Sequence, residues 1–279
     1  MSMATAAGST DKAFDYISKM VLEASAIVLD AQKAYLVESR LAPILRANEF
    51  ESLSDLVEEL KKVTSRNLRQ EVVEAMTTNE TSFFRDIHPF EAMKAQIVPE
   101  LISRRSAEKK ITIWSNACSS GQEPYTLAML LRENFPELRG WKVELIGSDL
   151  DTQILDKAQS GVFNQTEVNR GLPMQLLLKY FERDGLHWKI KDEIREMITF
   201  RQLNLVEPFP VSMPKMDIIF LRNVLIYFSV ETKEEILDKA RRLLREDGYL
   251  FLGGGESIMN LNVKFAREQM GKAVCYRPT

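Results

Sequence analysis

Apolar residues in the first 75 or so positions recur every three or four residues, with polar residues between them. The clearest examples are Phe14, Ile17, Met20 and Val21, followed later by Leu53, Leu56, Val57 and Leu60. This spacing gathers the apolar side chains on one face of a helix, and the alternation typical of strands is almost absent. We therefore predict a small all-helical N-terminal domain and linker over residues 1–85.

The pattern changes between Lys110 and Gly255, where β-rich apolar runs alternate with helical segments. The runs predict strands at Ile111–Ala117, Lys142–Asp149, Met197–Leu205, Met216–Asn223 and Tyr249–Glu256. Helices are predicted between most of them, at Glu123–Asn134, Asp151–Ser160 and Thr232–Arg245, the last opening with a capping box of Thr232 and Glu235. Such alternation predicts a parallel sheet covered on both faces, with ligands outside the carboxyl ends of the strands. Residues 86–279 are expected to form this α/β domain, closed by a hairpin through Gly271.

One segment interrupts the alternation of strands and helices. Residues 161–196 are longer than a simple helical connection, and the stretch "GLHWKIKDEIREMITF" alternates like a pair of short strands. We expect an insertion that forms a small antiparallel β-subdomain.

Composition narrows the classes of function. The net charge of −3 and the pI near 5.7 leave no global basic surface, which argues against a nucleic-acid substrate. Two cysteines and two histidines argue against a disulfide framework and against a metal site. The longest apolar run, residues 216–228, is interrupted by Asp217, Arg222 and Asn223, and the N-terminus lacks the pattern of a secretory signal. We expect a cytoplasmic protein without membrane insertion.

The turn "ACSSGQE", Ala117 to Glu123, joins the first predicted strand to a helix. It lacks the three glycines of a dinucleotide loop, and a carboxylate in the first helical turn repels a phosphate but attracts a cation. S-adenosylmethionine, which has an adenosine, an ammonium and a sulfonium but no phosphate, meets that demand. Alternatively, Ser120 and Glu123 have capping-box spacing, so Glu123 would bind a backbone N–H. The next strand ends at Asp149, which is placed to accept both ribose hydroxyls, whereas Asp151 suits the N-cap of the following helix.

Five motifs in this order resemble the CheR family, the chemotaxis receptor methyltransferases of bacteria. They are "TTNETSFFRD" from Thr77, "ACSSGQEPYTLAM" from Ala117, "GSDLDTQIL" from Gly147, "NL" at Asn204 and "FLRNVLIYF" from Phe220. The resemblance covers nearly the whole chain. It implies a Rossmann-like class I methyltransferase sheet that uses S-adenosylmethionine and releases S-adenosylhomocysteine.

The resemblance also implies site residues. Those matching the family's cofactor-binding positions are Asn79, Thr81, Arg85, Glu123, Asp149, Asn204, Leu205, Arg222 and Asn223. Tyr227 matches a tyrosine near the transferred methyl, which makes Arg85 and Tyr227 the catalytic candidates. Each has a plainer interpretation: Arg85 as a solvated charge, Tyr227 as core packing and Asn223 as a turn residue. Phe83 and Phe84 are expected to pack between domains instead of touching the cofactor.

The implied reaction transfers a methyl group to the γ-carboxylate of a receptor glutamate, giving a methyl ester. Glutamate is already ionised at neutral pH, so no general base is required. The protein must align the carboxylate oxygen, the methyl carbon and the sulfur, and remove water from a weak nucleophile. Arg85 would hold the carboxylate, and Tyr227 would orient it or line the methyl channel.

The resemblance implies chemoreceptor cytoplasmic domains as partners. Family members approach the acidic methylation region with a basic helix, for which this chain offers Lys33, Arg40 and Arg46. Members that tether to a receptor's C-terminal pentapeptide use a glycine-bearing loop between two strands. Here that loop, residues 181–190, is short and has only Gly185, so we expect no tethering. A monomer is expected.

Two other functions remain open from the sequence. One is a methyltransferase that acts on a nucleobase or a small molecule. Enzymes that methylate DNA amino groups place a proline pair after the fourth strand, where this chain has Arg222-Asn223-Val-Leu-Ile-Tyr227. A cofactor-binding regulator without catalytic activity is the second alternative. It would bind the cofactor but transfer no methyl group.

Overall fold

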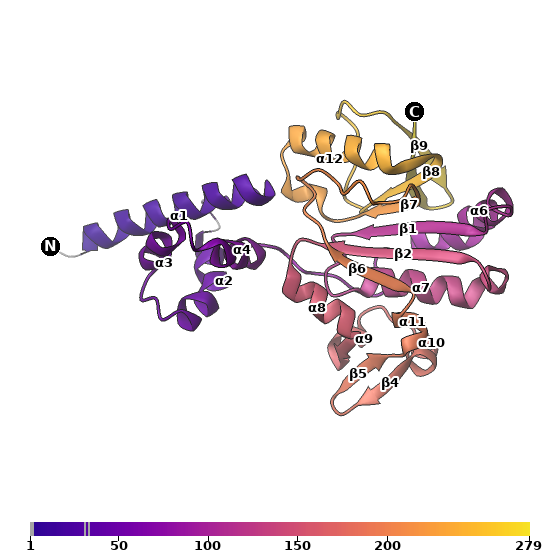
Figure 1. Ribbon diagram of the computed structural model, residues 1–279, viewed down its shortest axis with the longest axis horizontal. Helices are drawn as coiled ribbons and strands as arrows, with labels where there is room; N and C mark the ends of the chain where they lie inside the picture. The colour runs from indigo at the N-terminus through magenta and orange to yellow at the C-terminus, as the bar shows by residue number, and fades with distance from the viewer. Residues whose placement is uncertain (1–2, 31, 33) are drawn as a thin grey trace. The chain divides into compact units, whose positions relative to one another are not determined.

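The computed structural model describes residues 3–30, 32 and 34–279, with side chains described from residue 12 onward. The chain divides into two units (Figure 1). One is a helical unit, which contains the residues up to Thr78 together with Tyr227–Thr232. The other is an α/β unit, which contains Asn79–Ile226 and Lys233–Thr279.

The helical unit contains α1 (Met3–Ser25), α2 (Ala34–Ala47), α3 (Leu53–Leu60) and α4 (Arg66–Ala75). Its core consists of the apolar residues that recur at helical spacing, among them Ile17, Val21, Leu41, Leu56 and Leu60, all fully buried. A capping box of Ser52 and Asp55 begins α3. The described part of this unit is helical, as the hydrophobic spacing predicts.

A seven-stranded sheet forms the centre of the α/β unit, with the order β6-β2-β1-β7-β8-β10-β9 (Figure 1). The strands are β1 (Lys110–Asn116), β2 (Lys142–Asp149), β6 (Ile198–Gln202), β7 (Met216–Leu221), β8 (Leu244–Leu252), β9 (Phe265–Met270) and β10 (Ala273–Pro278). The first five run parallel, and β10 pairs antiparallel with both β8 and β9. The order reverses at β1, so the carboxyl ends of β1, β2 and β7 flank one ligand-binding edge.

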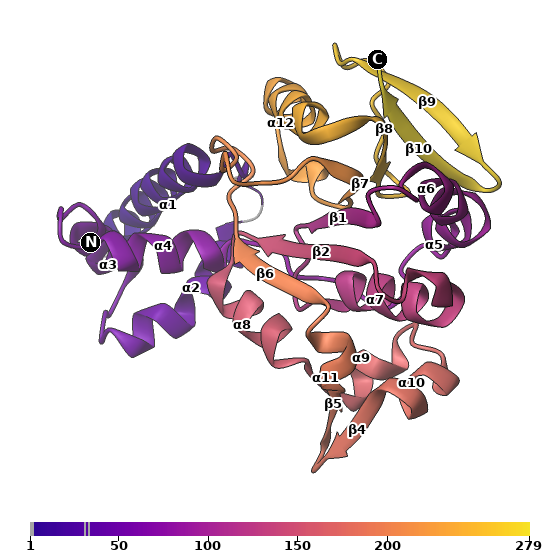
Figure 2. The ribbon, with the colours of Figure 1, turned by 45° about the vertical axis from the view of Figure 1, so that its right-hand side comes forward.

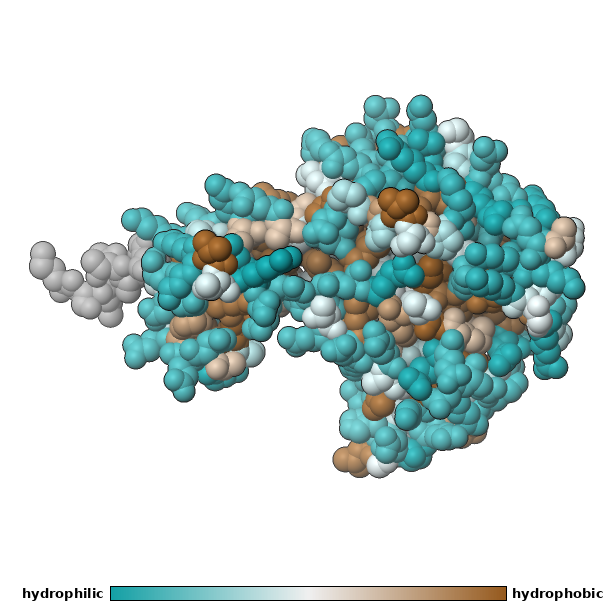
Figure 3. Space-filling model, viewed as in Figure 1, coloured by the Kyte–Doolittle hydropathy of each residue, from teal (hydrophilic) through white to brown (hydrophobic). Residues whose placement is uncertain are grey.

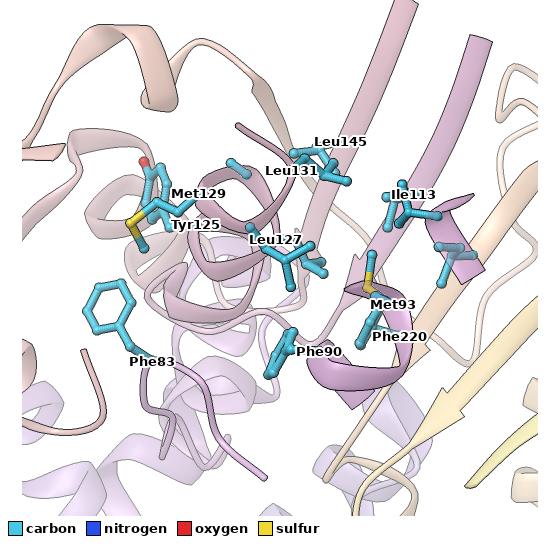
Figure 4. Close-up of a cluster of buried hydrophobic side chains, with 14 of the residues drawn as sticks. Phe83, Phe90, Met93, Ile113, Tyr125, Leu127, Met129, Leu131, Leu145 and Phe220 are labelled. Carbon is cyan, nitrogen blue, oxygen red and sulfur yellow. The ribbon is translucent and has the colours of Figure 1, made fainter. Parts of the chain in front are cut away.

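Helices cover both faces of this sheet (Figure 2). They are α5 (His88–Ala92), η2 (Met93–Ile97), α6 (Val98–Arg104), α7 (Gln122–Asn134), α8 (Thr152–Ser160) and α12 (Val230–Leu243). Two single-turn helices, η3 (Pro136–Leu138) and η4 (Leu225–Tyr227), lie in the connections after α7 and β7. One face packs Ile113, Leu145 and Phe220 against residues of α5, η2 and α7 in a single buried cluster (Figure 4). The alternate strand residues, such as Ile219 and Leu250, are equally buried on the other face, where α12 contributes Ile236 and Leu237.

A separate three-stranded antiparallel sheet lies between α8 and β6 in the chain, with the order β3-β5-β4. Its strands are β3 (Val162–Asn164), β4 (Phe181–Asp184) and β5 (His187–Ile190), accompanied by α9 (Gln165–Asn169), α10 (Met174–Tyr180) and α11 (Asp192–Arg195). The doubly wound sheet, the helical unit and this small antiparallel sheet confirm the predicted fold class.

Element boundaries differ most from the sequence predictions at β6, α12 and β8. The strand predicted at Met197–Leu205 is shorter, because β6 ends at Gln202 and leaves Asn204 and Leu205 in the following loop. The capping box at Thr232 is wrong, because α12 begins at Val230 and the hydroxyl of Ser229 accepts from the Thr232 N–H at 3.3 Å. The strand predicted from Tyr249 begins five residues earlier, at Leu244, directly after α12. The polar residues Arg245, Glu246 and Asp247 masked its start in the hydrophobic pattern.

Hydrophilic residues cover most of the face shown in Figure 3. Among the described residues, no helix has the length and apolar character needed to span a bilayer.

Candidate functional site

The turn between β1 and α7 is held in an unusual backbone conformation. Ala117, Ser119 and Gly121 all have positive φ, at 48°, 51° and 91°. A Cβ on Gly121 would lie 3.1 Å from both Tyr125 and Ala158, so glycine also meets a space requirement there. The resulting turn points the Ser119 N–H at the Asp149 carboxylate, with an N–O distance of 2.8 Å. The turn thereby joins the carboxyl ends of β1 and β2.

Glu123, in the first turn of α7, does not form the capping box that its spacing with Ser120 suggests. The N-cap of α7 is Gly121, without a side-chain cap, and the Ser120 hydroxyl bonds to Gln122. The Glu123 carboxylate instead accepts from the Ser115 hydroxyl at 2.8 Å and from Arg222 Nη1 at 2.6 Å. The carboxylate is therefore held at the edge of the sheet by side chains at the ends of β1 and β7.

Arg222, directly after β7, is the centre of this charge cluster, and its side chain is only 2% exposed. Its Nη2 donates to the Asp86 carboxylate at 2.9 Å and to the Arg85 carbonyl at 2.8 Å. Within the described part of the chain, its Nε is buried without a hydrogen-bond partner. Two carboxylates share one guanidinium, so the cluster of Glu123, Arg222 and Asp86 keeps a net negative charge.

Asp149, the last residue of β2, is 7% exposed, and burial raises its pKa to about 6. Its oxygens accept from the backbone N–H groups of Ser119 at 2.8 Å and Asp151 at 3.1 Å, which oppose that rise. Asp151 is the N-cap of α8, as predicted, and accepts from the Ile154 N–H at 3.0 Å. Asp149 is thus the acid at the strand end that is not used to cap a helix.

Residues 79–86, called the strap below, cross this edge of the sheet. Asn79 anchors one end: its Nδ2 donates to Asp151 at 2.8 Å, and its carbonyl accepts from the Ser119 hydroxyl at 2.9 Å. The Arg222 bonds to Arg85 and Asp86 anchor the other end. The strap therefore joins the turn at β2 to the charge cluster at β7.

The middle of the strap is fixed by packing. The ring of Phe83 is 1% exposed and lies edge-on to Phe163 at 5.1 Å and to Phe181 at 5.9 Å, both from the small sheet. The Phe84 N–H donates to the Thr126 hydroxyl at 3.2 Å. The guanidinium of Arg85 donates to the Glu80 carbonyl at 2.9 Å in an exposed position, while the residue as a whole is half-buried. Thr81 is half-buried between these anchors.

Asn204 and Leu205 lie in the loop after β6. The preceding N–H, of Leu203, donates to the Asp149 carbonyl at 2.9 Å, which keeps the loop beside the end of β2. Lys239 of α12 supports the same loop, because its Nζ donates to the carbonyls of Leu205 at 2.5 Å and Glu207 at 3.0 Å. The sequence did not single out Lys239, because its position in α12 resembles that of any cation on the surface of a helix.

Asn223 has a left-handed backbone, with φ at 58°, and its N–H donates to Glu256 at 2.7 Å. The turn role considered for it is therefore real. Glu256 was also missed, although the glycines of "GGGE" signal a close backbone approach. Tyr227 is half-buried and belongs to the segment grouped with the helical unit, where its carbonyl accepts from the Val28 N–H at 3.4 Å.

This edge can bind a ligand with both cationic and hydroxyl groups. The net negative cluster around Arg222 complements a cation, and Asp149 offers acceptors to hydroxyls. These features fit a nucleoside cofactor that has an amino-acid group. No group of three or more potential metal ligands occurs among the residues that the structure describes.

Comparison with known proteins gives two family matches that together span most of the chain. Residues 79–274 match the family described as "CheR methyltransferase, SAM binding domain", and residues 12–77 match "CheR methyltransferase, all-alpha domain".

Similar proteins include "Chemotaxis protein methyltransferase 1" of Pseudomonas aeruginosa, 41% identical over 90% of this chain and 92% of that protein. "Chemotaxis protein methyltransferase Cher2" of Pseudomonas putida is 36% identical over 95% of this chain and 97% of its own length. A "Chemotaxis protein methyltransferase" of Vibrio anguillarum is 37% identical over 98% and 99% of the two chains.

Proposed function

The chain belongs to the CheR family of S-adenosylmethionine-dependent chemotaxis methyltransferases, and we propose that it methylates glutamate γ-carboxylates of chemoreceptors. The product would be a glutamyl methyl ester, formed in sensory adaptation. The observation that supports this most is the negative cluster of Glu123, Arg222 and Asp86 beside Asp149 at the carboxyl edge of the sheet. It places carboxylates where the ammonium group and the ribose hydroxyls of the cofactor need partners.

We propose that Glu123 holds the cofactor's ammonium group and that Asp149 accepts from its ribose hydroxyls. Arg222 is proposed to lie beside the methionine part of the cofactor, as the resemblance to the family implies. Further cofactor contacts are proposed for Asn79, Thr81 and Arg85 of the strap and for Asn204, Leu205 and Asn223 of the loops after β6 and β7.

The cofactor supplies a methyl carbon bonded to a positively charged sulfur, and a receptor carboxylate oxygen bonds to that carbon as the carbon–sulfur bond breaks, leaving S-adenosylhomocysteine. The residues of the chain have no proton to move, because the nucleophile is ionised at neutral pH. Their work is to bind, to orient and to exclude water. The anchored strap supports this, since its backbone and side chains are fixed before any substrate arrives.

Arg85 is the proposed contact for the incoming carboxylate. One of its Nη atoms donates to the Glu80 carbonyl at 2.9 Å, which leaves other guanidinium donors for a substrate. Tyr227 is proposed to orient the carboxylate or to line the methyl channel. It follows Ile226, whose N–H donates to Glu256 at 3.3 Å.

We propose that the helical unit approaches the acidic receptor in the cytoplasm, with the enzyme acting as a monomer. Of the three candidate cations, Lys33 lies outside the described residues. Arg40 donates to the Met76 carbonyl at 2.6 Å and the Thr78 hydroxyl at 3.0 Å, so much of its hydrogen-bonding capacity is used within the unit. Arg46, which is exposed at the end of α2, is the better candidate for a receptor contact.

Independence from the receptor pentapeptide is proposed as well. The connection between β4 and β5 is only Gly185 and Leu186, with Asp184 paired to His187. A hairpin this tight supports the expectation of no tethering loop. Calorimetric titration of the protein with a receptor C-terminal pentapeptide should give no heat of binding, and micromolar affinity would contradict this.

The experiment that tests the function is transfer of tritiated methyl from S-adenosylmethionine to membranes that contain chemoreceptors. Wild type should give base-labile counts on a receptor, and Arg85→Ala and Asp149→Asn should lose them. Arg139→Ala is the matched control, because Arg139 is exposed and distant in sequence from every proposed site residue. Cofactor binding without receptor labelling would refute the proposed substrate and favour a non-catalytic regulator.

A further inference from the structure

We propose that Glu256 is a positioning residue for the cofactor site, because one carboxylate holds the loops after β7 and β8 together. Its Oε2 accepts from the Asn223 N–H and from the Gly253 N–H, both at 2.7 Å. Its Oε1 accepts from the Ile226 N–H at 3.3 Å. Three backbone donors from two loops therefore converge on one side chain.

Two of these donors, the N–H groups of Asn223 and Ile226, lie at the two ends of one short segment after β7. The Asn223 backbone has a positive φ of 58°, which a non-glycine residue adopts only when its surroundings hold it. Asn223 directly follows Arg222, and Ile226 directly precedes Tyr227. Glu256 therefore fixes both ends of the short segment that separates the charge cluster from the proposed catalytic tyrosine.

The glycine stretch after β8 makes this arrangement possible. A Cβ on Gly253 would lie 2.7 Å from Asn223 Nδ2 and 2.8 Å from Glu256 Oε2, closer than real Cβ atoms approach. Glycine at 253 thus leaves the space that the side-chain ends of Asn223 and Glu256 occupy. A Cβ on Gly254 would be 3.7 Å from the Asp86 carboxylate, so the same loop also lies against the strap.

Glu256 holds the backbone of Asn223, a proposed cofactor contact, so it acts on the site through Asn223 and the adjoining Arg222. The inference rests on the proposed placement of those two residues in the cofactor site. Its consequence is that the affinity for cofactor depends on an acceptor oxygen at position 256 and much less on the charge. The glutamine variant, which keeps one acceptor oxygen for the Asn223 and Gly253 donors, should therefore rescue what alanine loses.

The test is calorimetric titration of S-adenosylhomocysteine into the full-length protein. Glu256→Ala should raise the Kd roughly tenfold, the size of one lost hydrogen bond to a charged group. Glu256→Gln should stay within about threefold of wild type, because the two shortest bonds share a single oxygen. Tyr249→Phe is the stability control: it removes the 2.7 Å bond from the Tyr249 hydroxyl to Glu100, and its Kd should equal that of wild type at a comparable loss in Tm.

Two further variants separate the possible failures. Gly253→Ala pushes Asn223 and Glu256 apart without changing charge, and it should also weaken binding if Glu256→Ala does not fold. Glu123→Gln reports on the proposed cofactor site alone, since Glu123 makes no contact with Glu256 among the described hydrogen bonds. Normal affinity of Glu256→Ala beside weakened Glu123→Gln overturns the positioning role. Equal weakening of Glu256→Ala and Glu256→Gln also overturns it, whereas normal binding by Glu123→Gln refutes the proposed site itself.

Discussion

Arg222 and Glu123 are 99 positions apart in the chain, yet Arg222 Nη1 and Glu123 Oε2 are joined by a 2.6 Å ion pair with both side chains largely buried. The pair connects the end of β7 to the start of α7. Asp86 of the strap competes for the same guanidinium at 2.9 Å. When a cationic ligand group pairs with Glu123, Asp86 can therefore still balance the charge of Arg222.

Glu123→Gln should weaken cofactor binding and lower stability together. The amide keeps the shape of the side chain but removes the charge that faces both Arg222 and the proposed ammonium group. We expect the Kd for S-adenosylhomocysteine to rise by at least about tenfold and the free energy of unfolding to fall by about 1–3 kcal/mol. Calorimetry and urea unfolding measure the two effects. Glu137→Gln, an exposed position, is the control and should change neither.

Cofactor affinity should depend on pH through Asp149. Its pKa is raised to about 6 by burial, so below that pH the carboxyl is protonated and loses acceptor capacity for the ribose hydroxyls. The affinity should fall by up to about tenfold per pH unit below pH 6. Titrations between pH 5 and pH 8 measure this, and in Asp149→Asn the dependence should be flat. An equal slope in both proteins would assign the dependence to another group.

Asp149 should affect the stability of the fold in the opposite direction: a higher pH favours cofactor binding but lowers the free energy of unfolding. A carboxyl whose pKa is higher in the folded than in the unfolded chain stabilises the fold at pH values below its unfolded pKa, and this contribution is lost as the pH rises through the folded value. For Asp149 the window runs from 3.8 to about 6. As the pH rises through this window, the free energy of unfolding of Asp149→Asn should therefore gain about 2–3 kcal/mol relative to that of wild type. Urea unfolding of both proteins at the two ends of the window measures this gain. A loss of stability in Asp149→Asn relative to wild type would contradict the prediction.

Gly171 should not tolerate a side chain. Its φ is +89°, and a Cβ would lie 2.1 Å from the carbonyl oxygen of Phe83 in the strap. Gly171→Ala should lower the free energy of unfolding by about 3 kcal/mol or more, since overpacking adds to backbone strain. Gly185→Ala separates the two causes, because Gly185 also has positive φ but open space around it, and should cost about 1 kcal/mol. Equal losses would mean that the strap yields without resistance.

Arg40 and Arg46 should separate structure from receptor recognition. Arg40→Ala removes two hydrogen bonds at the end of α4 and should lower the stability of the helical unit by about 1–2 kcal/mol. Arg46→Ala should change stability by less than about 0.5 kcal/mol but reduce receptor methylation, more so at low salt. Thermal unfolding and methylation rates at two salt concentrations measure these effects. Full methylation by Arg46→Ala would remove it from the receptor surface.

The hydrophobic pattern predicted the fold because the spacing of buried residues along the chain differs between strands and helices. β2 spans the predicted residues Lys142–Asp149, and β1 differs from its prediction by one residue at each end. Prediction was weaker where polar residues occupy a regular element, as at the start of β8, and where two caps compete, as Ser229 and Thr232 do before α12. Local propensity does not decide such boundaries, because tertiary contacts select among similar alternatives.

The candidate site was predictable as residue types but not as contacts. A carboxylate after the turn and another at the next strand end indicate a cationic nucleoside cofactor from chemistry alone. The pairing of Glu123 with Arg222 joins positions 99 residues apart, and the bonds from Asn223 and Ile226 to Glu256 join positions 33 and 30 residues apart. Only the register of the parallel strands brings them to one edge, and no local pattern records that register.

The Phe83 ring, seated between Phe163 and Phe181, limits how this enzyme can be recombined with its relatives. A chimera that exchanges the insertion of residues 161–196 also exchanges Phe163 and Phe181, the two rings that hold the Phe83 ring of the strap. Such a graft should retain the sheet but lose the lining of the cofactor site, unless the donor segment brings matching aromatic rings and a glycine at position 171. Compatibility between relatives is thus set by a few residues that hold the strap against the small sheet.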